Sequence, residues 1–199
     1  ENAQSTGTDT TAVGSESDAM GVNASAFGYD ANATGDGSTA IGRSASAGPV
    51  SGVANNTTAI GYLAKAEGGA ATAVGALAEA TQAGATALGE FAKATGTDAT
   101  SLGEDSTATM TGAVAVGNGA DATGIQAIAM GYNAAAGDQG AIAVGSNTIA
   151  TANAIAVGID AQADGLTSVA LGQSAAASAT GALALGAGSE ASDTNAIAL

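Results

Sequence analysis

The sequence lacks cysteine, histidine and tryptophan altogether in its 199 residues. Without cysteine and histidine, the chain has no thiol chemistry, none of the usual zinc ligands and no imidazole general base. Its carboxylates are scattered, with no nucleophile elbow and no phosphate-cradling loop beside them. We therefore expect a protein that is not an enzyme and that has no cofactor, catalytic residue or metal ligand.

Basic residues are scarce, with 3 lysines and arginines against 18 acidic residues and a formal net charge of −15. A surface of this sign repels phosphate backbones and anionic lipid, so we expect no nucleic-acid partner and no direct membrane contact. No apolar run approaches the roughly 18 residues of a membrane span, and no signal peptide opens the chain. We expect the sequence to be a fragment of a mature protein.

Bulky side chains are also few. The chain is 46% hydrophobic but only 3% aromatic, and it contains 31 glycines. Most of the hydrophobic residues are alanine, which fills little volume, so a thick globular core is excluded. Any core must be thin.

What the sequence does contain is a repeat across residues 1–199, which we interpret as a single repeat domain. A glycine that follows a large apolar residue recurs every fourteen residues, with one interval of nineteen and one of thirteen. We call these the marker glycines: Gly14, Gly28, Gly42, Gly61, Gly75, Gly89, Gly103, Gly117, Gly131, Gly145, Gly158, Gly172 and Gly186.

Two strands are predicted in each period. After a marker glycine, small residues alternate with polar ones, as in Ala64, Lys65 and Ala66, which is typical of a strand with one dry face. Before a marker glycine the pattern is apolar on both faces, as in residues 142–144. Two short strands and two turns per period predict an all-β parallel solenoid of about fourteen coils, each stacked on the last at about 4.8 Å.

The strand before each marker glycine also predicts an oligomer. Its middle residue is nearly always alanine, and the residues one and three before the glycine share the opposite face. If the alanines face the interior, the large residues form an exposed apolar stripe that another copy of the chain should cover. In the alternative arrangement, the large residues fill the interior and the alanines face outward. The alternation of side chains along the strand does not distinguish a dimer from a trimer, although three copies around one axis suit one apolar stripe per chain.

The expected interface residues are Val114, Val116, Ile128, Met130, Ile142, Val144, Ile155, Val157, Val169, Leu171, Leu183 and Leu185. In the first half of the chain, the position three before the marker carries threonine or serine, and it changes to aliphatic residues near residue 107. We expect a wetter subunit contact before this change and a drier one after it.

The units T-A-I-G at 58–61, V-A-L-G at 169–172 and A-K-A-E-G at 64–68 resemble the two half-repeats of YadA-like heads in trimeric autotransporter adhesins. The resemblance covers essentially the whole chain. It implies a left-handed parallel β-roll, a homotrimer, and display on the bacterial cell surface at the tip of an outer-membrane-anchored fibre. It also implies attachment to host matrix or cell-surface proteins such as collagen, laminin or fibronectin. The neck, stalk and membrane anchor of that family are expected beyond Leu199.

Two sets of residues are candidates for ligand binding. The long interval after Gly42 predicts an insertion loop at about 48–56, with Pro49, Val50 and Ser51. The alternative, which we favour, is a tolerated insertion without a binding role. Tyr29, Tyr62 and Tyr132 directly follow marker glycines and should lie at turns. Two other functions remain open: an ice-binding solenoid, because of the threonine column, and a passive spacer within a fibre.

Overall fold

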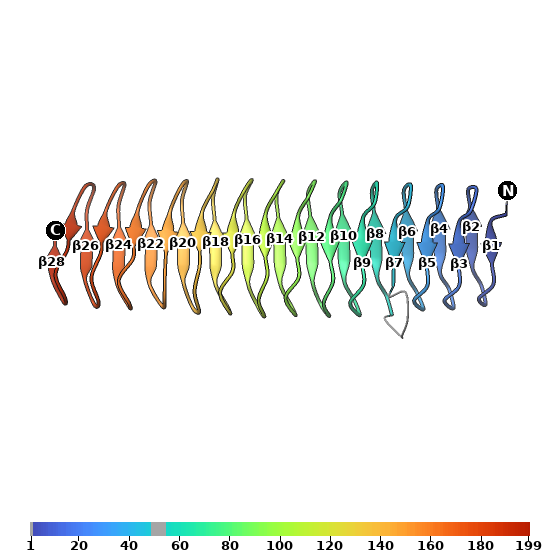
Figure 1. Cartoon of the computed structure of the whole chain (residues 1–199), viewed down its shortest axis with the longest axis horizontal. Helices are drawn as coiled ribbons and strands as arrows, with labels where there is room; N and C mark the ends of the chain where they lie inside the picture. Colours follow the sequence, from blue (N-terminus) through green and yellow to red (C-terminus); the bar gives the residue numbers. More distant parts are fainter. Residues whose placement is uncertain (1, 49–54) are drawn as a thin grey trace. The chain divides into compact units, whose positions relative to one another are not determined.

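Every regular element that the computed structural model describes, in residues 2–48 and 55–199, is a β-strand. The chain divides into two compact units, unit 1 (Glu1–Asp105) and unit 2 (Ser106–Leu199). In each unit, two short strands and two tight turns make a coil, and strands of successive coils pair in parallel (Figure 1). The predicted all-β parallel solenoid of about fourteen coils is confirmed. The described residues include no helix suited to crossing a membrane.

The odd-numbered strands follow the marker glycines and are two residues long. In unit 1 they are β1 (Gln4–Ser5), β3 (Asp18–Ala19), β5 (Asn32–Ala33), β7 (Ser46–Ala47), β9 (Lys65–Ala66), β11 (Glu79–Ala80) and β13 (Lys93–Ala94). In unit 2 they are β15 (Thr107–Ala108), β17 (Asp121–Ala122), β19 (Ala135–Ala136), β21 (Ile149–Ala150), β23 (Gln162–Ala163), β25 (Ala176–Ala177) and β27 (Glu190–Ala191).

The even-numbered strands precede the marker glycines. In unit 1 they are β2 (Thr11–Val13), β4 (Ser25–Phe27), β6 (Thr39–Ile41), β8 (Thr58–Ile60), β10 (Thr72–Val74), β12 (Thr86–Leu88) and β14 (Thr100–Leu102). In unit 2 they are β16 (Val114–Val116), β18 (Ile128–Met130), β20 (Ile142–Val144), β22 (Ile155–Val157), β24 (Val169–Leu171), β26 (Leu183–Leu185) and β28 (Ile197–Ala198).

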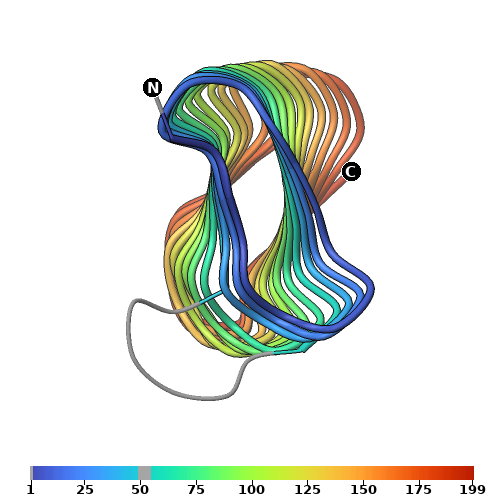
Figure 2. The same ribbon diagram turned by 90° about the vertical axis from the view of Figure 1, so that its right-hand side faces the viewer.

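Equivalent positions of the repeat pair with one another, even where the period is irregular. Across the long interval, β6 pairs directly with β8, which places Ile41 opposite Ile60. Across the short one, β20 pairs with β22, which places Val144 opposite Val157. Because the difference in length is absorbed outside the strands, each side chain column stays in register, and Figure 2 shows the coils of unit 1 following one another with nearly the same outline.

The interior is lined by four small residues per coil. In the coil that begins at Gly61 these are Ala64, Ala66, Ala71 and Ala73, and none of the four exposes any surface. The same four positions are alanine, serine or threonine in every other coil from Gly14 onward. A methyl group or hydroxyl from each wall is all that the narrow interior accommodates. The alternative with large residues inside is therefore wrong, and the alanines face inward.

Hydroxyl side chains replace alanine at seven fully buried positions. Two of them donate to a carbonyl of their own coil, and two others pair with each other across successive coils. The Oγ of Ser17 donates to the Gly14 carbonyl at 2.9 Å, and Thr148 Oγ1 donates to the Gly145 carbonyl at 2.7 Å. Ser38 Oγ and Thr57 Oγ1 lie 2.7 Å apart on successive coils. These bonds offset the desolvation of a buried hydroxyl, which explains why serine and threonine are tolerated here.

The marker glycines are required by both conformation and space. Gly131, for example, has φ of 138°, a region that residues with a Cβ rarely adopt. A Cβ at Gly131 would also meet the carbonyl group of Gly145 on the next coil. The second glycine of the repeat differs, since a Cβ at Gly68 or Gly124 would collide with the next coil although neither has a left-handed φ. Close backbone approach, rather than turn conformation, selects glycine there.

Candidate interaction surfaces

The outward face of the even-numbered strands in unit 2 is apolar. Each of these strands from β16 to β26 points two large side chains outward on either side of a buried alanine, as Ile128 and Met130 flank Ala129. The twelve residues expected at a subunit interface all lie on this face, and all are partly or largely exposed in the single chain: Val114, Val116, Ile128, Met130, Ile142, Val144, Ile155, Val157, Val169, Leu171, Leu183 and Leu185. Their contact with another copy stays a prediction.

In unit 1 the same face consists of two unlike columns. One column is formed by hydroxyl residues, in which Thr58, Thr72 and Thr86 stack in register. The other is formed by large side chains, of which Leu88 is 47% exposed. No outward position of any even-numbered strand carries a charged residue. We call this surface the uncharged face.

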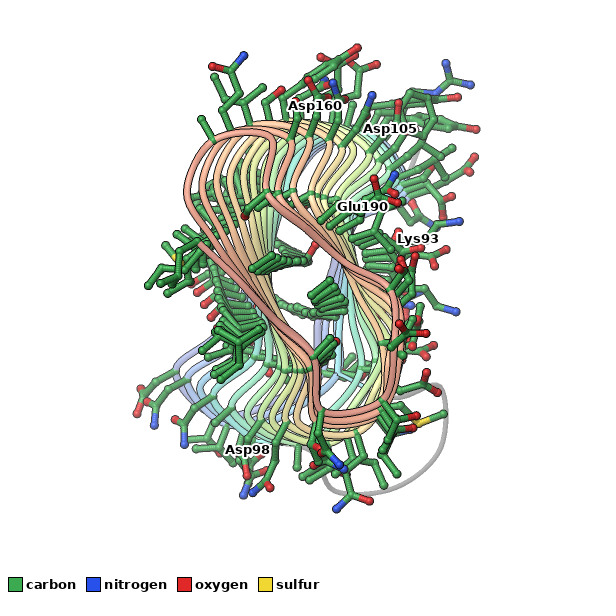
Figure 3. All side chains as sticks on the ribbon, turned by 90° about the vertical axis from the view of Figure 1, so that its left-hand side faces the viewer. Lys93, Asp98, Asp105, Asp160 and Glu190 are labelled. Carbon is green, nitrogen blue, oxygen red and sulfur yellow. The ribbon has the colours of Figure 1, made fainter. Side chains whose placement is uncertain are left out.

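Charge is concentrated on the odd-numbered strands and on the turns. Lys65, Glu79 and Lys93 are in register on β9, β11 and β13, so that opposite charges alternate from coil to coil. Figure 3 shows Lys93 pointing away from the interior, whereas Asp98 and Asp105 of the same unit project from opposite turns. The charged side chains therefore lie on the odd-numbered strands and the turns, and the uncharged face has none.

Two of the tyrosines predicted to bind ligand lie in one column with an arginine. The guanidinium carbon of Arg43 lies 6.0 Å from the ring centroid of Tyr29 and 5.6 Å from that of Tyr62. These distances allow cation–π attraction on both sides of the guanidinium group. Tyr132 of unit 2 is 55% exposed and has no such neighbour. The tyrosines lie at turns, as predicted. The stack was not predicted, although Tyr29, Arg43 and Tyr62 each directly follow a marker glycine.

The remaining ligand candidates, Pro49, Val50 and Ser51, lie outside the described residues. The strands on either side of the insertion do stack, since Ser46 of β7 is in register with Lys65 of β9.

A hydrogen bond to the Glu16 carboxylate raises the pKa of Tyr29, and the negative charge of Glu16 adds to the effect. Both causes favour the neutral phenol. Because the folded-state pKa is raised, the stabilisation is complete below pH about 10 and is lost as the pH rises through the folded-state value.

We expect Glu16→Gln to lower the pKa of Tyr29, because the substitution removes the charge next to the phenol. Titration of the Tyr29 ring carbons by NMR measures the shift. Glu79→Gln on β11 is the matched control and should leave the titration unchanged. An unaltered midpoint in Glu16→Gln would show that the carboxylate does not act on Tyr29.

A second column at the same turn was not found from the sequence. Leu63, Leu77 and Phe91 occupy the second position after successive marker glycines, with φ of 54°, 58° and 57°. In the other described coils from Gly14 to Gly186, this position carries a polar residue or glycine. Leucine and phenylalanine are poorly suited to this conformation. The departure is visible only when the coils are aligned on the marker glycine and the turn conformation is known.

The described residues form no pocket, and they bring together no group of three or more histidine, cysteine, aspartate or glutamate side chains.

Comparison with known proteins finds a match to one family model and a similarity to solved structures. The model of the YadA head domain repeat (2 copies) matches residues 1–17, 19–45, 54–78, 66–92, 80–103, 94–120, 122–148, 152–175 and 177–199. A solved structure, the collagen-binding domain of the Yersinia adhesin YadA, is similar with 20% sequence identity and a TM-score of 0.26. That match covers 91% of this chain and 68% of the other. No curated protein sequence matches significantly.

The family match extends over nearly all of the chain, and its repeats follow the coils seen in the structure. The chain therefore belongs to the YadA head domain repeat family.

Proposed function

We propose that the chain is the head of a homotrimeric surface adhesin that attaches bacteria to host matrix or cell-surface proteins. The observation that carries the proposal is the uncharged face, which the even-numbered strands form within each unit, in a chain with 18 acidic residues. Membership of the YadA head family supports the same role. Display at the tip of an outer-membrane-anchored fibre is part of the proposal.

Self-association through the uncharged face would leave the odd-numbered strands and the turns exposed. The described residues of these surfaces form no pocket, so attachment would use many shallow contacts. Contacts repeated on three chains and on successive coils strengthen binding through avidity. Collagen, laminin and fibronectin are the proposed ligands, because each is a long molecule that can engage several coils at once.

A solid-phase binding assay with immobilised collagen, laminin and fibronectin tests this function. We expect the assembled protein to bind at least one of them saturably, and binding to weaken by about tenfold or more when assembly is prevented, because avidity is lost. Albumin-coated wells are the control for nonspecific adsorption. If the assembled protein bound none of the three, the passive-spacer alternative would replace the adhesin proposal.

The ice-binding alternative can be tested on the same sample by measuring thermal hysteresis. In unit 1 the threonine column lies beside exposed large side chains such as Leu88, so the hydroxyl groups do not form a uniform surface. Nothing in the structure favours this function over adhesion.

A further inference from the structure

Three successive coils of unit 1 carry apolar side chains at a turn position where the other described coils carry a polar residue or glycine. These residues are Leu63, Leu77 and Phe91, each of them second after a marker glycine, and we call them the turn column. Leu63 and Phe91 are each 40% exposed. All three have a left-handed backbone, which bulky residues tolerate poorly. Strain that persists at an exposed position is a mark of a functional surface.

The turn column occurs where the uncharged face has lost aliphatic residues. In these three coils, the position three before the marker glycine carries Thr58, Thr72 and Thr86. Each strand from β16 to β26 in unit 2 has an aliphatic residue at that position, and the second residue after its marker glycine is polar or glycine. The four other coils of unit 1 from Gly14 onward are polar at both positions. In three coils, therefore, an apolar side chain is absent from the strand and present at the turn.

We propose that the turn column packs against a second copy of the chain, on the opposite turn of unit 1. By the opposite turn we mean the one that joins an odd-numbered strand to the next even-numbered strand. The inference rests on the proposed function, because it extends the contact of the proposed trimer from the uncharged face to the ends of the coils.

The positions of the two turns within a coil favour this contact. Asp105 occupies the position of the turn column, Asp98 lies on the opposite turn, and Figure 3 shows the two projecting from opposite ends of the coil. When the uncharged faces of three copies surround one axis, one turn of each copy lies beside the opposite turn of the next. Cyclic symmetry involves no shift along the axis, so coils of the same level meet.

The opposite turn at the level of the turn column is small and has no charge. It consists of residues 68–70 in one coil and residues 82–84 in the next, and five of these six residues are glycine or alanine apart from Gln82. Ala70, Ala83 and Gly84 are exposed. The N–H groups of Ala70 and Gly84 already donate to the carbonyls of Asn55 and Gly69, at 2.9 and 3.0 Å. The surface therefore offers apolar packing and not an added strand.

Gly69 is the position that most needs a second copy to explain it. A Cβ at Gly69 would meet nothing within 4 Å, and the residue has no left-handed φ, so its own copy does not require glycine there. Glycine at such a position lowers stability, because it leaves more freedom to the unfolded chain. A bare backbone at this turn makes room for a large side chain of the next copy, such as Leu77.

Cysteine cross-linking tests the contact, because the chain has no cysteine of its own. We expect the double variant Leu77→Cys with Gly69→Cys to form disulfides between copies under a mild oxidant, giving covalent dimers and trimers on a non-reducing gel. A second pair one coil further, Phe91→Cys with Ala83→Cys, should behave in the same way. Each single variant should remain uncross-linked, because equivalent turns of the three copies lie apart. Absence of cross-links in both pairs overturns the proposal.

Gly69→Gln tests the same contact without a thiol. We expect it to raise the dissociation constant of the assembly at least tenfold in sedimentation velocity, because the new side chain fills the space for the next copy. Gly137→Gln is the matched control, since Gly137 also has open space for a Cβ and no left-handed φ, and it should assemble like the wild type. A trimer in which Gly69→Gln has no effect contradicts the turn contact alone, whereas a monomeric wild type contradicts the proposed assembly as well.

Discussion

Val157→Asp is expected to raise the dissociation constant of the assembly by about a hundredfold or more. Val157 lies on the uncharged face and is 37% exposed in the single chain, so an aspartate is compatible with the fold itself. In the assembly the same carboxylate would be buried against another copy. The effective cost of burying an unpaired ion is several kcal/mol per group, and the variant introduces one in every chain.

The cost is comparable to the contribution of one coil. Each large side chain that becomes fully buried contributes roughly 1.5–3 kcal/mol, and a coil of unit 2 carries two of them, so one carboxylate offsets about the gain from its own coil. Sedimentation velocity of the variant measures the result directly. A dissociation constant that is unchanged in Val157→Asp would mean that subunits do not meet through β22.

Ile149→Asp is the matched control. Ile149 is 38% exposed, almost the same as Val157, but it lies on the outward side of the odd-numbered strand β21. Equivalent positions on β17 and β27 already carry Asp121 and Glu190. We expect this variant to assemble like the wild type. A difference between the two variants would then result from the position of the carboxylate on the uncharged face and not from the added charge itself.

The second large effect is expected for Gly131→Ala, which should lower the free energy of unfolding by about 2–6 kcal/mol. About 1–3 kcal/mol comes from forcing an L-residue into φ of 138°, and a similar amount from overlap with the Gly145 backbone on the next coil. Because a solenoid depends on contacts between neighbouring coils, a fault of this kind interrupts the stack locally.

Thermal or urea unfolding of Gly131→Ala measures the loss, and Gly137→Ala is the control. Gly137 has open space where a Cβ would be placed and no left-handed φ. Its replacement should be neutral, or should stabilise the chain by up to about 1 kcal/mol, because alanine restricts the unfolded chain. Equal stability of the two variants would show that the marker glycines are not required by coil stacking.

The strands and the direction of their side chains were predictable because successive side chains of a strand point to opposite faces. Once Ala129 is assigned to the interior, Ile128 and Met130 must point to the opposite face, and the structure agrees. The pairing of equivalent positions was also predictable, because only that register keeps small residues inside every coil. The periodicity of the sequence was therefore sufficient to predict the solenoid and to identify the uncharged face.

The turns were less predictable because their conformation is not encoded in hydrophobic spacing. Leu63, Leu77 and Phe91 are apolar residues that occupy a left-handed position, and no propensity argument would place them there. The Arg43 stack could have been found by aligning coils on the marker glycine, since Tyr29, Arg43 and Tyr62 share one column. The distances that make it a cation–π stack required the structure.

The large residues of the even-numbered strands point away from the interior, and we propose that other copies of the chain cover them. Sedimentation equilibrium of the whole chain at micromolar concentration should therefore give one species with three times the 18.2 kDa mass of the chain. A stable monomer at the same concentration would show that these residues stay uncovered.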